Sequence, residues 1–192
     1  MHTWIVLLRG INVGGHGVLP MKRLVELMEK AGCLNVRTYI QSGNAVCTSK
    51  IATASTLAQK IGKAILAAQG FEPKVMVLSL ADFAAAAKAN PYPTKVPTAL
   101  HLFFLAAPPA DPSLAALEPF KLASEKYTLD GRTLYFYTPD GFGTSKLASK
   151  VENLAKVDTT ARNWNTVEAL LALAAAPTTP VAKNVTKKTT AK

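Results

Sequence analysis

The order of strand and helix patterns in the first 80 residues constrains the fold more than any other feature of the sequence. Strand patterns alternate between apolar and polar residues or form short apolar runs, whereas helix patterns repeat every three to four positions. Strands are expected at residues 4–8, 36–40, 45–48 and 74–80, and helices at residues 20–31 and 55–69. The resulting order is strand, helix, strand, strand, helix, strand.

This order is typical of the ferredoxin-like arrangement, or α-β plait, in which two helices cover one face of an antiparallel sheet. The first and third strands are neighbours in that sheet. The loop that follows Leu8 is therefore expected to converge with the turn that precedes Ala45. The polar residues brought together would be Arg9, Gly10, Asn12, Ser42, Gly43 and Asn44.

The second half of the chain repeats part of this order after a proline-rich connection at residues 90–97. Its expected elements are a strand at residues 99–105, a helix at 112–121, a hairpin turning at Asp130-Gly131, and helices at 145–154 and about 160–175. Only Lys156-Val157 stands where a fourth strand would come. The sequence thus predicts an α+β fold of two ferredoxin-like subdomains, the second with a C-terminal helix in place of its last strand.

The predicted subdomains span residues 1–90 and 98–176, and a basic tail is expected at 177–192. The formal net charge of +10 favours a nucleic-acid or anion partner, and the tail contributes four lysines and no acid. A segment of Pro, Thr, Ala and Lys cannot bury enough apolar surface to order itself, so we expect disorder there. The tail is either a non-specific phosphate-binding arm or a solvated end.

The sequence favours a cytoplasmic protein that does not enter the membrane. No basic segment precedes the first apolar run, and no run approaches the roughly 20 apolar residues of a membrane span. Cys33 and Cys47 lack metal-binding spacing and a disulfide framework, so they are interpreted as small hydrophobic residues. Zinc, hydrolase and dinucleotide motifs are missing from the sequence, and we expect neither a metal nor a cofactor.

Two further motifs could hold an anion at the start of a helix. Residues 141–146 form a glycine-rich turn, but they lack the spacing of a phosphate-binding loop, and Thr144 or Ser145 is more simply an N-cap. Arg162 and Asn163 are expected near the positive end of the last helix. They would bind an anion there, or form a salt bridge or an interdomain hydrogen bond.

Four stretches together carry a resemblance to a known family: LLRGINVGG at residues 7–15, Pro20-Met21, TYIQSGNAV at 38–46 and TARNWNTV at 160–167. The chain resembles, from about residue 3 to 175, the bacterial family called domain of unknown function 1697. The resemblance implies a pair of ferredoxin-like subdomains and no particular activity. Its signature positions fall on Arg9, Gly10, Asn12, Gly14, Gly15, Ser42, Gly43, Asn44, Arg162, Asn163 and Trp164.

The functional hypothesis that these residues favour is binding of a small phosphate- or carboxylate-bearing ligand, such as a nucleotide, at the loop edge between the subdomains. The expected ligand-binding residues are Arg9, Gly10, Asn12, Gly14, Gly15, Ser42, Gly43, Asn44, Arg162 and Asn163. The same side chains could instead only stabilise their own loops.

Three other functions stay open at this point: non-specific nucleic-acid binding through the basic surface and tail, an oligomeric interaction protein without a ligand, and an enzyme that uses Arg9 and His16. An RNA-recognition module is disfavoured, because its third strand should carry stacking aromatics and residues 44–48 contain none.

Overall fold

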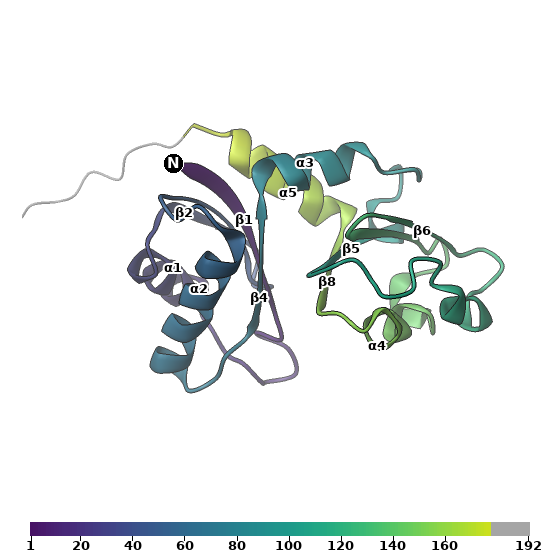
Figure 1. The fold of residues 1–192 in the computed structure, drawn as a ribbon, viewed down its shortest axis with the longest axis horizontal. Helices are drawn as coiled ribbons and strands as arrows, with labels where there is room; N and C mark the ends of the chain where they lie inside the picture. The colour runs from purple at the N-terminus through teal and green to yellow at the C-terminus, as the bar shows by residue number, and fades with distance from the viewer. Residues whose placement is uncertain (178–192) are drawn as a thin grey trace, which may run out of the picture.

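The computed structural model describes residues 1–177, which form two four-stranded antiparallel sheets with helices packed against them (Figure 1). This confirms the predicted α+β class. The first sheet has the strand order β2-β3-β1-β4. Its strands are β1 (His2–Arg9), β2 (Cys33–Tyr39), β3 (Asn44–Ser49) and β4 (Lys74–Ser79), and its helices are α1 (Met21–Lys30) and α2 (Ala54–Gln69).

The second sheet has the strand order β6-β7-β5-β8. Its strands are β5 (Leu100–Leu105), β6 (Lys126–Asp130), β7 (Thr133–Tyr137) and β8 (Thr159–Asn163). The α-helices outside the first unit are α3 (Leu80–Lys88), α4 (Val151–Ala155) and α5 (Trp164–Ala175). Short 3-10 helices are η1 (Pro97–Ala99), η2 (Ala115–Phe120), η3 (Phe142–Thr144) and η4 (Ala148–Lys150).

The expectation that a helix replaces the last strand of the second unit was wrong. β8 is that strand, and it pairs with β5 in an antiparallel register that sets Arg162 opposite Leu102. The helix begins four residues later than expected, at Trp164, because Asn163 caps it: the Asn163 Oδ1 accepts the backbone N–H of Thr166 at 3.1 Å. The residues before the cap are thus free to pair as a strand.

The helices expected at residues 112–121 and 145–154 are mostly short 3-10 turns. Pro119 lies within η2 and has no N–H to donate, so an α-helical ladder cannot run through it. In the second segment, the Ser145 Oγ accepts the backbone N–H of Ala148 at 3.1 Å, and only Val151–Ala155 form an α-helix. The glycine-rich turn at residues 141–146 therefore leads into a 3-10 turn rather than into a long helix.

Three apolar clusters form the interior. The first packs one face of β1, with Val6 and Leu8, beneath α1 and α2, and the third packs the outer face of β5 against η2 and α4. The middle cluster joins the other face of β1, with Ile5 and Leu7, to the inner face of the second sheet through α3 and α5. Figure 1 shows α3 and α5 lying together across the two halves. The two sheets therefore share a core.

Candidate functional site between the two halves

The loop after β1 and the turn before β3 lie side by side. The backbone N–H of Leu8 donates to the Gly43 carbonyl at 2.8 Å. Asn12 extends the contact, since its Nδ2 donates to the carbonyls of Gln41 at 2.8 Å and Leu19 at 3.0 Å, while its Oδ1 accepts the Leu19 N–H at 2.8 Å. Asn12 thus uses its whole amide to hold its own loop against the turn.

Gly43 is required by packing at this junction. Its backbone has a φ of +72°, and a Cβ there would lie 2.6 Å from the Leu8 Cβ and 2.8 Å from the Ile11 Cδ1. Gly14 differs, because a Cβ on it would meet nothing within 4 Å. The glycines of the predicted site therefore have unequal roles, and Gly43 allows the turn to approach β1.

Arg162 of β8 links the second half to this junction. Its Nε donates to the Asn44 Oδ1, and its Nη2 donates to the carbonyls of Leu8 at 2.7 Å and Ser42 at 3.4 Å. Its Nη1 donates within β8, to the Thr160 Oγ1 at 2.9 Å and the Ala161 carbonyl at 2.7 Å. Arg162 therefore forms hydrogen bonds to the first half of the chain, and whether the halves are separate domains stays a prediction.

The acceptors of Arg162 are all uncharged oxygens. None of the ion pairs among residues 1–177 includes Arg162. Burial lowers the pKa of this guanidinium to about 10, because desolvation disfavours its charged form. At neutral pH the junction therefore holds a partly buried positive charge, and no carboxylate of the described residues forms an ion pair with it.

Arg9 has a carboxylate partner, which the sequence did not reveal. Both of its terminal nitrogens contact the carboxylate of Glu152 in α4, and its Nη1 also donates to the Thr159 carbonyl at 3.2 Å. The hydrogen bond to Glu152 raises the pKa of Arg9, and the same bond lowers the pKa of Glu152. Lys74 adds a contact with Asp158 and lies 3.5 Å from Glu152. These four side chains form one ion-pair network between the halves.

A pocket of about 440 Å³, which we call the loop pocket, opens at this junction. It is lined by residues 8–13 and 41–42 from the first half, and by Phe103, Ala148, Ser149, Glu152 and residues 159–162 from the second. Of the predicted ligand-binding residues, Arg9, Gly10, Asn12, Ser42 and Arg162 line it. The remaining ones, Gly14, Gly15, Gly43, Asn44 and Asn163, do not.

The predicted ligand-binding residues that do not line the loop pocket include two at an exposed loop tip and one buried behind the pocket. Gly14 and Gly15 form the exposed tip of the loop, between Val13 and His16. Asn44 is fully buried behind the pocket, where it holds Arg162. His16, considered as a proton carrier, lines neither this pocket nor the larger one described next.

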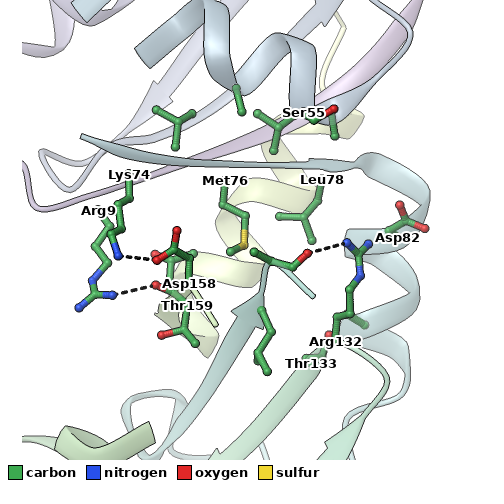
Figure 2. Close-up of a pocket in the computed structure, with 18 of the residues that line it drawn as sticks. Arg9, Ser55, Lys74, Met76, Leu78, Asp82, Arg132, Thr133, Asp158 and Thr159 are labelled. Atoms are coloured by element: carbon green, nitrogen blue, oxygen red, sulfur yellow. Dashed lines mark hydrogen bonds and ion pairs between the residues drawn. The ribbon is translucent and has the colours of Figure 1, made fainter. Parts of the chain in front are cut away.

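A second pocket, of about 750 Å³, follows the outer edge of β4, and we call it the strand-edge pocket (Figure 2). Residues 74–78 of β4 line it, together with parts of α2, α3 and the second sheet. Arg9, Thr159 and Thr160 line both pockets, so the ion-pair network lies between them. No sequence signal pointed to this pocket, because it arises from the packing of one half against the other.

Residues 1–177 contain no group of three or more His, Cys, Asp or Glu side chains that could hold a metal ion. Across the same residues, none of the helices combines the length and the apolar character that a membrane span needs.

A known protein family includes most of this chain. The family described as "Protein of unknown function (DUF1697)" matches residues 1–135. The chain belongs to this DUF1697 family. The match covers the first sheet and continues into β7, and it therefore includes the loop after β1 and the turn before β3.

The fold of this DUF1697 chain is also found in a solved structure. The chain is similar to "conserved bacterial protein SP0830 from Streptococcus pneumoniae", with a TM-score of 0.71 and 24% sequence identity, over 90% of this chain and 98% of that one. At this identity the likeness concerns the fold alone. No curated protein matches the chain.

Proposed function

We propose that this DUF1697 protein binds a small anionic ligand, bearing phosphate or carboxylate, in the loop pocket. The observation that carries the proposal is the uncompensated charge of Arg162, which lines the pocket and is surrounded by uncharged acceptors. A partly buried cation without an ion-pair partner is costly, and an anion in the adjacent pocket would lower that cost. All the bonds of Arg162 can stay in place while its charge attracts the ligand.

Arg9 supplies the direct contact in this proposal. Its side chain is 40% exposed, and both terminal nitrogens of its guanidinium already contact the carboxylate of Glu152. A phosphate or carboxylate of a ligand can accept the same pair of N–H bonds and can replace Glu152 on Arg9. The ion pair would then act as a competitor that ligand binding displaces.

The size of the loop pocket is compatible with a nucleotide. A volume of about 440 Å³ lies within the range of small-molecule sites, roughly 300–1,000 Å³. Uncharged donors and acceptors from Ser42, Ser149 and Thr160 surround the cations and could bind the hydroxyls of a sugar.

We also propose the finer fold description, that residues 1–90 and 98–176 are two ferredoxin-like units of a cytoplasmic bacterial protein. The element order β1-α1-β2-β3-α2-β4 and the strand order β2-β3-β1-β4 support it for the first unit. The second unit has the matching strand order β6-β7-β5-β8.

A thermal-shift assay with ATP, glucose 6-phosphate, inorganic phosphate and citrate tests the ligand proposal. A ligand at 100 times its Kd stabilises the fold by about 2.7 kcal/mol, which gives a visible shift. We expect the shift to be lost in Arg9→Ala and to appear at lower ligand concentration in Glu152→Gln, which frees Arg9. The exposed pair Arg23 and Glu26 provides the matched controls Arg23→Ala and Glu26→Gln. Equal shifts in Arg9→Ala and Arg23→Ala would exclude the loop pocket.

Non-specific nucleic-acid binding is the second candidate, because the whole chain has a net charge of +10. It predicts that affinity for a single-stranded oligonucleotide falls steeply with salt and falls further when residues 177–192 are deleted. Those residues lie outside the described part of the chain except for Pro177. Binding that is unchanged by the deletion would remove the tail from this function.

A further inference from the structure

The outer edge of β4 is open toward the strand-edge pocket. β4 is the last strand of the first sheet and pairs with β1. Among the described residues, no backbone hydrogen bond connects residues 74–79 to a segment on the other side. An open edge of this kind is a template for one more strand.

The register shows which backbone groups face the pocket. The Leu8 N–H bonds to Gly43 in the direction of β3, and neighbouring residues of a strand point their backbone groups to opposite edges. Leu7 and Arg9 therefore face β4, where they pair with Met76 and Lys74. It follows that Val75, between these two partners, and Val77, on the other side of Met76, direct their N–H and C=O groups away from β1.

The walls on both sides of this edge are made of small side chains. Ala54 and Ala58 of α2 line the pocket on one face of β4, and Ala85 and Ala86 of α3, with its C-cap residue Ala89, line it on the other. Figure 2 shows Lys74, Met76 and Leu78 pointing to one side of β4, with Ser55 of α2 on the opposite side. Alternate side chains of an added strand would lie against these two walls, and β4 offers about 20 Å of edge, given its six residues.

The charges of the lining residues balance. Three are cations and three are acids: Arg9, Lys74 and Arg132, and Asp82, Asp130 and Asp158. Lys74 and Asp158 already form an ion pair at one end. The pocket thus offers no net charge to a strongly basic or acidic segment, and its complement is a segment with uncharged side chains.

We propose that the strand-edge pocket binds an extended peptide with uncharged side chains, which adds to β4 as a fifth strand of the first sheet. The backbone of the partner bonds to Val75 and Val77, and its alternate side chains pack on the alanines of α2 and α3. This is β-strand addition, in which backbone hydrogen bonds provide affinity and pockets for alternate side chains provide specificity. It is independent of anion binding in the loop pocket.

Selection from a displayed library of random eight-residue peptides, with the full-length protein as the target, provides the probe. The selected peptide is then resynthesised with single backbone N-methyl groups at each position. We expect alternation: methylation at every second position weakens binding about tenfold or more, and methylation at the positions between has little effect. A library without a binder, or a selected peptide whose N-methyl series shows no alternation, would overturn the proposal.

Two measurements on the protein locate the peptide. Val75→Pro removes a backbone N–H that points away from β1, a position at which an edge strand tolerates proline. Val75→Ala is the matched control, because it keeps that N–H. We expect Val75→Pro to lose peptide binding while both variants keep the same ligand shifts in the loop pocket. Amide hydrogen exchange at Val75 and Val77 should be fast in the free protein and slow with peptide. Slow exchange without peptide would mean that a second copy or the chain's own tail already covers the edge, which would also overturn the proposal.

Discussion

Arg162 donates its Nε–H to the Oδ1 of Asn44, although 118 positions separate the two residues in the chain. Asn44 is fully buried, and its Nδ2 donates in turn to the Tyr39 carbonyl at 3.3 Å, across the turn between β2 and β3. A single amide therefore stabilises the turn of the first half and holds the arginine of the second. The junction between the halves depends on this pair.

The first prediction is that Arg162→Lys destabilises the protein by about 2–5 kcal/mol, because a lysine cannot reproduce the planar fork and leaves buried acceptors unpaired. Urea unfolding at pH 7 measures the loss. Arg23→Lys is the matched control, since Arg23 forms an exposed pair with Glu26 on α1 and should change stability by less than about 1 kcal/mol. Similar losses in both variants would show that the Arg162 bonds contribute little.

The second prediction concerns glycine packing at the same junction. Gly43→Ala should destabilise the fold by at least about 2 kcal/mol, because the new Cβ would overlap Leu8 and Ile11 in addition to taking a positive φ. Gly14→Ala shares the positive φ, at +57°, but has free space around it, so about 1 kcal/mol is expected. Thermal unfolding of the two variants separates the clash from the backbone strain. A Gly14→Ala loss as large as that of Gly43→Ala would contradict the packing argument.

The parts of the site that sequence analysis predicted are those encoded locally. Periodic patterns placed β1 and β3, and antiparallel pairing then required the loop at Arg9 to meet the turn at Ser42. β8 was missed because its five residues, TTARN, have no apolar alternation and pair with β5 across more than 50 positions. Such a pairing depends on tertiary context rather than on propensity.

The partners of the charged residues could not be predicted for a related reason. Glu152 on α4 has no local feature that distinguishes it from an ordinary surface glutamate, and its contact with Arg9 spans 143 positions. Lys74 and Asp158 meet across 84 positions. Pairs of this kind, and the strand-edge pocket beside them, are defined only once the two halves are packed together.

The third prediction is a pH dependence that arises from the Arg9–Glu152 ion pair. The hydrogen bond from Arg9 lowers the pKa of Glu152 in the folded protein. The stability that the ion pair provides is therefore fully present above the usual glutamate pKa, and it is lost as the pH falls through the lowered pKa. Glu152→Gln should therefore cost about 0.5–1 kcal/mol at pH 7, a small amount because the carboxylate is one-third exposed. The cost should shrink as the pH falls below the usual glutamate pKa. Urea unfolding of both proteins from pH 7 downward provides the measurement, and a constant difference would contradict the assignment.

The fourth prediction rests on His101 in β5, whose ring stacks on Phe142 with centroids 3.7 Å apart. Its Nδ1 is buried and has no hydrogen-bond partner among the described residues. Desolvation lowers the pKa of His101 to about 4, below its usual value of 6.5, so the unfolded chain takes up a proton first as the pH falls. Stability should therefore decrease between pH 6.5 and pH 4, and be restored as the pH rises.

His101→Phe isolates this contribution, since it keeps the stacked ring and removes the titrating group. Relative to the variant, the wild type should lose about 2–3 kcal/mol of unfolding free energy between pH 8 and pH 4.5, while other titrating groups cancel in the difference. Urea unfolding across this range gives the two curves. Parallel curves would mean that the His101 ring is protonated as readily in the fold as in the unfolded chain, and that the stacking on Phe142 does not exclude water from it.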